Sequence, residues 1–80
     1  GIPIVVRADG EEGEKKELSI RFVKDYMEAN FGFTFTDNQP HHIEITAPNG
    51  SVVKKDSENA EVIVSVQDVT AGTYSIVITA

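Results

Sequence analysis

Apolar and polar side chains alternate along much of the chain, and this alternation is the spacing of a half-buried β-strand. It is most regular in the stretches HIEITA, EVIVSV and TYSIVIT, where every second side chain is aliphatic or aromatic. Together with β-branched content, the alternation predicts up to seven short strands: Ile2–Arg7, Glu17–Val23, Phe31–Thr36, His41–Ala47, Ser51–Lys55, Glu61–Val66 and Thr73–Thr79.

Turn-forming residues separate these segments. Asp37–Pro40 is a polar turn cluster, Pro48–Gly50 contains the Asn-Gly pair typical of β-hairpins, and Asp68–Gly72 precedes the last segment. Lys24–Asn30 is ambiguous because apolar residues in and before it have helical spacing, so it predicts one helical turn or an irregular connection. No stretch provides the long connection that a parallel βαβ unit needs.

These features predict a single all-β, antiparallel β-sandwich of six to seven short strands, with residues 1–80 as one domain. Eighty residues without cysteine allow one small core and no disulfide. The side chains expected to face that core are Ile4, Val6, Leu18, Ile20, Phe22, Phe33, Phe35, Ile43, Ile45, Val62, Val64, Val66, Tyr74, Ile76 and Ile78.

Composition excludes several classes of function. A formal net charge of −6 disfavours nucleic acid, because Lys and Arg contacts to phosphate supply most of that affinity. No apolar run approaches the roughly 18 residues that a membrane span needs. No nucleophile motif such as Gly-x-Ser-x-Gly is present, so we predict that the chain is not an enzyme and needs no cofactor.

The segment DVTAGTY, residues 68–74, is the most specific motif. It resembles the corner of immunoglobulin-like sandwiches, where a Tyr near the start of a core strand returns its hydroxyl to the upstream backbone. The resemblance assigns structural roles in this corner to Asp68, Gly72 and Tyr74. Ile76 stands where antibody domains have a Cys, so the similarity is to cysteine-free domains. A generic turn followed by a buried Tyr is the alternative.

The C-terminal half, HIEITAPNGSVVKKDS followed by AEVIVSVQDVTAGTYSIVITA, has a second resemblance. It is similar to small secreted immunoglobulin-like domains of unknown function from gut anaerobic Gram-negative bacteria, and to the sorting tails of type IX secretion cargo. The resemblance implies a non-enzymatic protein that is secreted, periplasmic or on the cell surface. The sequence starts with Gly1 and not with Met, so we expect that a targeting segment was removed upstream; a natural fragment or a propeptide product is the alternative.

Three small-ligand sites can be considered. His41 and His42 are the only histidines, but neighbouring strand residues face opposite sides, so we expect no zinc site. Asp9–Glu17 is acidic but lacks the spacing of a calcium loop, and is predicted to be a solvated loop. Tyr26 could stack on a sugar ring, because it lies in the ambiguous segment where exposure is expected.

The last strand is the predicted interaction surface. Thr73–Thr79 has no following strand, so its backbone would form an open edge that recruits a strand from a partner or a second copy. The edge residues are Thr73, Ser75, Val77 and Thr79. The alternative is that Ile2–Arg7 covers this edge. The predicted function is an interaction or scaffold module; a carbohydrate-binding accessory domain and a secretion or assembly sorting domain are the alternatives.

Overall fold

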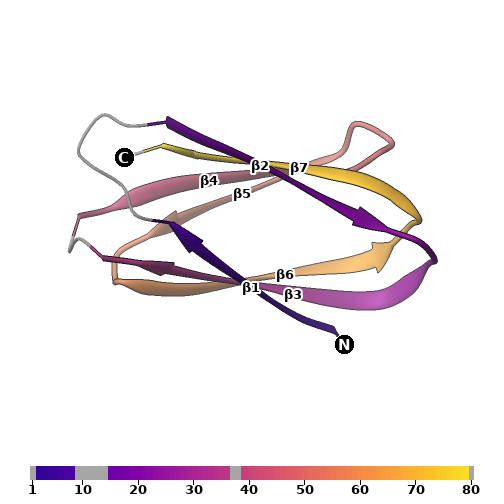
Figure 1. The fold of residues 1–80 in the computed structure, drawn as a ribbon, viewed down its shortest axis with the longest axis horizontal. Coiled ribbons are helices and arrows are strands. Elements are labelled where there is room, and N and C mark those ends of the chain that lie inside the picture. The colour runs from indigo at the N-terminus through magenta and orange to yellow at the C-terminus, as the bar shows by residue number, and fades with distance from the viewer. Residues whose placement is uncertain (1, 9–14, 37–38, 80) are drawn as a thin grey trace.

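The computed structural model describes residues 2–8, 15–36 and 39–79, with side chains from residue 15 onward. The described chain is all β and forms two facing sheets (Figure 1). This confirms the predicted cysteine-free, immunoglobulin-like sandwich of six to seven strands. The strands are β1 (Ile2–Ala8), β2 (Lys15–Phe22), β3 (Tyr26–Phe35), β4 (His41–Thr46), β5 (Val52–Ser57), β6 (Glu61–Val69) and β7 (Gly72–Thr79).

The two sheets differ in size. One contains three strands in the order β1-β3-β6, and the other contains four in the order β2-β7-β4-β5. All neighbouring strands are antiparallel, as predicted, except β1 and β3, which run parallel with Ile4 opposite Phe31. The prediction of a wholly antiparallel sandwich is wrong for this pair, because the chain between β1 and β3 passes through β2 in the other sheet. The β4–β5 hairpin turns at the predicted Asn-Gly pair, where Gly50 has a φ of 92° and donates its amide to Ala47 O at 2.9 Å.

The prediction that Thr73–Thr79 forms an open edge is wrong. β7 lies between two strands of its own chain, with Leu18 of β2 opposite Ile76 on one side and Ile45 of β4 opposite it on the other. Antiparallel pairing on both sides satisfies the backbone groups that an edge would leave open. The alternative is also wrong, because β1 pairs with β3 in the other sheet. β2, which lies far earlier in the sequence, occupies the edge of β7 that was expected to be open.

The helical interpretation of Lys24–Asn30 is wrong as well. Most of this segment belongs to the ten-residue strand β3, where Ala29 is fully buried opposite Val66 of β6. Val23 and Met27, which suggested the apolar face of a helix, are 82% and 88% exposed. A turn of helix gains stability only by burying such a face, whereas the strand gains a full ladder with β6.

The core lies between the sheets and follows the predicted alternation. Of the expected inward side chains, ten are buried: Phe22, Phe33, Phe35, Ile43, Ile45, Val64, Val66, Tyr74, Ile76 and Ile78. Leu18, Ile20 and Val62 are partly buried against them, and Ile4 and Val6 precede the described side chains. The prediction omitted three buried apolar residues, Ala29, Phe31 and Val69, and two buried polar residues, His41 and Ser57.

Aromatic rings form the centre of this core. Phe22 contacts Tyr26, Phe31 and Tyr74 edge to face, with ring centroids 5.9, 6.2 and 5.3 Å away. Edge-to-face pairs are favourable beyond the apolar area that they bury. This cluster joins β2, β3 and β7, and therefore ties the N-terminal strands to the corner strand.

Candidate functional site

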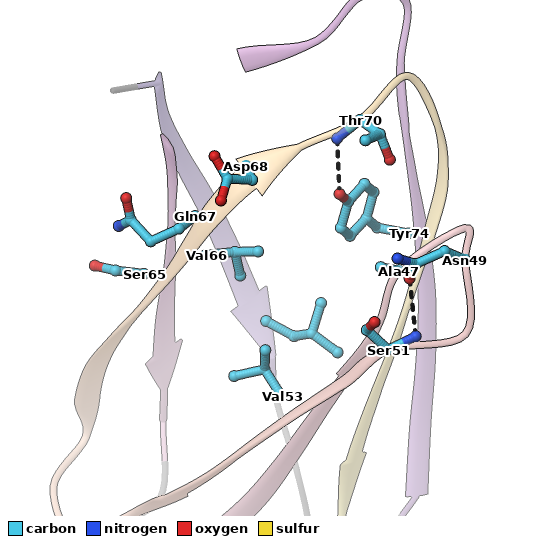
Figure 2. A pocket seen from close by; sticks show the side chains of 11 residues that line it. Ala47, Asn49, Ser51, Val53, Ser65, Val66, Gln67, Asp68, Thr70 and Tyr74 are labelled. Carbon is cyan, nitrogen blue, oxygen red and sulfur yellow. Dashed lines mark hydrogen bonds between the residues drawn. The ribbon is translucent and has the colours of Figure 1, made fainter. Parts of the chain in front are cut away.

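The corner of β6 and β7 has the geometry that its sequence predicts. Tyr74 is 2% exposed, and its hydroxyl accepts a hydrogen bond from the amide of Thr70 at 3.1 Å (Figure 2). Gly72 has a φ of 135° and passes close to the hairpin, because a Cβ there would lie 2.7 Å from the Cγ of Pro48. The corner therefore holds the β4–β5 hairpin close to the turn between β6 and β7.

Asp68 contributes to the corner through its backbone conformation. Its φ is 53°, a left-handed value that Asp tolerates better than most side chains. This value shifts the alternation of β6 by one residue, so that Val69 follows Val66 into the core and Asp68 remains exposed. The side chain of Asp68 forms no hydrogen bond or ion pair with the described residues of the chain.

A groove of about 310 Å³ lies beside this corner, between β5 and β6 (Figure 2). Its apolar residues are Ile45, Ala47, Val53 and Val66, together with the ring of Tyr74. Polar residues form the rim, from the hairpin on one side and from β6 on the other: Asn49, Ser51, Ser65, Gln67, Asp68 and Thr70. An apolar floor with polar groups at its border is the usual composition of a ligand site.

The groove exists because the two sheets are unequal. β5 is the outer strand of the larger sheet, and its inward-facing residues Val53 and Lys55 are exposed because no strand of the smaller sheet covers them. Residues 58–60 connect β5 to β6 at one end, where Phe35 N donates to Ala60 O at 2.7 Å. From there the two strands diverge toward the corner (Figure 1).

β6 borders the groove with its unpaired edge and not with one of its two faces. Four consecutive residues, 65–68, line the groove, so side chains of both orientations and the backbone between them border it. β6 pairs only with β3 among the described strands. Its other side therefore presents backbone donors and acceptors toward the groove.

This edge is the least protected of the four in the sandwich. Charged residues and proline normally prevent strand edges from pairing with other chains. β1 contains Pro3 and Arg7, β2 contains four charged residues, and β5 has the sequence KKD at its centre. β6 instead contains VIVSVQ, a run of six uncharged residues without proline or glycine between Glu61 and Asp68.

The two histidines do not come together. His41 is buried and stacked on Phe35, with ring centroids 4.0 Å apart, and its amide donates to Ser57 Oγ at 3.0 Å. His42 lies on the outer face, where its Nδ1 is 2.5 Å from Asp56 Oδ1. Among the described residues, no group of three or more His, Asp or Glu side chains could hold a metal ion.

The two other sites considered from the sequence are the acidic segment, which the structure describes only in part, and Tyr26. Of the acidic segment, residues 9–14 lie outside the described residues, and Lys15–Glu17 begin β2 instead of continuing a loop. Tyr26 is half-buried in β3, with its ring edge to face against Phe22 and the Nζ of Lys24 5.4 Å from its centroid. It is therefore not the freely exposed ring that the sequence suggested.

Comparison with known proteins found no relative. No family model, no curated protein and no solved structure matches the chain. Among the described residues, no helix is long and apolar enough to cross a membrane.

The groove itself was missed by sequence reasoning. Its residues come from β4, β5, β6, β7 and the hairpin, and only the tertiary structure brings them together. One signal was present, since the uncharged run in β6 contrasts with the charged or proline-containing segments that form the other edges.

Proposed function

We propose that this chain is a non-enzymatic, extracytoplasmic interaction module that binds an extended segment of a partner protein along β6. The observation that supports this function is the unpaired, uncharged edge of β6 beside the apolar groove. An extended peptide that joins a sheet edge gains affinity from main-chain hydrogen bonds and specificity from alternate side chains in a groove. The extracytoplasmic location is supported only by the resemblance of the C-terminal half.

The added segment would act as the missing fourth strand of the smaller sheet. In that position its inward side chains would cover Val53, which is now 36% exposed, and extend the apolar contacts of Val66. A volume of about 310 Å³ is at the lower end of ligand sites, which suits a few side chains and not a folded element.

Neither alternative function has comparable support. The carbohydrate-binding alternative depended on an exposed Tyr26, whose ring already contacts Phe22 and Lys24. No feature of the described residues specifically supports the sorting alternative. Both therefore remain predictions from the sequence.

Backbone pairing can be tested with a pair of matched peptides. The probe is a peptide of about seven residues in which Val and Thr alternate, and its control has the same sequence with alternate amides N-methylated. Amide chemical shifts of the isotopically labelled chain are recorded during titration. We expect the probe to shift the amides of residues 64–67 and the control to shift none, because N-methylation removes the main-chain donors.

Two outcomes would contradict the proposed function. One is equal shifts from the probe and its N-methylated control, which would show that main-chain pairing is not involved. The other is a set of shifts confined to β2 or to the outer faces of the sheets.

A further inference from the structure

The charge at the groove restricts which segment can bind there. Asp68 is the only charged residue among those that line the groove, and it has no ion-pair partner among the described residues. It is exposed, so its carboxylate is hydrated in the free protein and available to a cation. Glu61, at the other end of the uncharged run, adds a second negative charge along the same strand.

A second copy of this chain is a poor occupant. If two copies paired antiparallel through β6 about a two-fold axis at Val64 or at Ser65, Glu61 of each copy would lie beside Asp68 of the other, one residue out of register. Like charges that are neighbours across a strand pair repel each other. Each copy also has a net charge of −6, so that long-range repulsion opposes the same encounter.

A basic segment from another protein can pair with the same edge of β6 without this repulsion. We infer, on the basis of the proposed function, that the segment bound along β6 has apolar side chains at alternate positions and a Lys or Arg that pairs with Asp68. The apolar side chains cover Val53 and Val66, and the cation pairs with Asp68, the one charged residue that lines the groove. Electrostatic attraction to the acidic chain also favours the encounter with a basic segment.

The charge of Asp68 can be removed without changing the left-handed backbone conformation of this residue. Asn adopts positive φ values as readily as Asp, so Asp68→Asn removes the carboxylate while keeping the local backbone. Glu17→Gln is the matched control, because it removes one exposed carboxylate from β2, which borders the larger sheet on the side away from the groove. Thermal unfolding of both variants establishes that they remain folded.

The probes are two sets of fluorescent peptides in which Val and Thr alternate. In the first set a single Lys occupies each position in turn, and in the second set a Glu takes the place of that Lys. We expect one Lys position to bind most tightly, and the Glu peptides to bind more weakly. Asp68→Asn should weaken that Lys peptide about two- to five-fold at low salt, as an exposed ion pair does. Glu17→Gln should leave its affinity unchanged, and about 1 M salt should remove most of the difference.

The outcomes separate the inference from the proposed function. If Lys and Glu peptides bind equally and both shift the amides of β6, strand addition stands and the basic partner is refuted. If no peptide shifts those amides, both are refuted. A third outcome is that the chain alone dimerises at high micromolar concentration, and that Gln67→Lys disrupts the dimer while Ser75→Lys, on the internal strand β7, does not. In that case the occupant is a second copy and the inference is wrong.

Discussion

Deletion of one hydroxyl group tests the corner that holds β6 to β7. In Tyr74→Phe the ring keeps its contacts with Phe22 and Phe31, and only the hydrogen bond from the amide of Thr70 is lost. A typical intramolecular hydrogen bond contributes about 0.5–1.5 kcal/mol to stability. This hydrogen bond is only part-buried, so we expect a loss of about 1 kcal/mol and not the larger penalty of a fully buried, unpaired donor.

Urea unfolding measures this difference directly. For a small domain with an m-value of about 1 kcal/mol/M, a loss of about 1 kcal/mol lowers the midpoint by about 1 M without changing m. The same loss lowers the melting temperature by about 4–8 °C for a chain of this size.

The chain contains its own control for this experiment. Tyr26 belongs to the same aromatic cluster, but its hydroxyl forms no hydrogen bond with a described residue. Tyr26→Phe should therefore change stability by less than about 0.5 kcal/mol. If the two substitutions have equal effects, the corner hydrogen bond contributes nothing specific and the reasoning is refuted.

Two further predictions concern the turns and the acidic segment. Gly72→Ala should cost about 2–4 kcal/mol, because it combines a left-handed backbone with a contact of 2.7 Å to Pro48, whereas Gly50→Ala meets no atom within 4 Å and should cost about 1–2 kcal/mol. Urea midpoints of the two variants check this order, and a reversed order would contradict it. Millimolar calcium should leave the melting temperature unchanged if Asp9–Glu17 binds no cation, and a rise of several degrees in a calorimetric scan would make this segment a calcium site.

The strands and their faces could be predicted from local pattern alone. Ile43 and Ile45 in β4, and Tyr74 with Ile76 in β7, face the core as their alternation indicates. The reason is that a strand has a side-chain period of two and one face of each sheet must be buried, so a short stretch of sequence contains the needed information. The Asn-Gly hairpin and the Tyr74 corner are local in the same sense, because each depends on a few neighbouring residues.

The neighbours of each strand were decided only by the tertiary structure. Nothing in TYSIVIT indicates that β2 will pair beside it, since any alternating strand offers the same backbone groups along its edge. The extended form of Tyr26–Asn30 has the same origin, because its ladder with β6 outweighs a local spacing that resembles a helix. The groove follows from these pairings: once β2 occupies the edge of β7, the edge left unprotected is that of β6, and its distance from β5 depends on the whole sandwich.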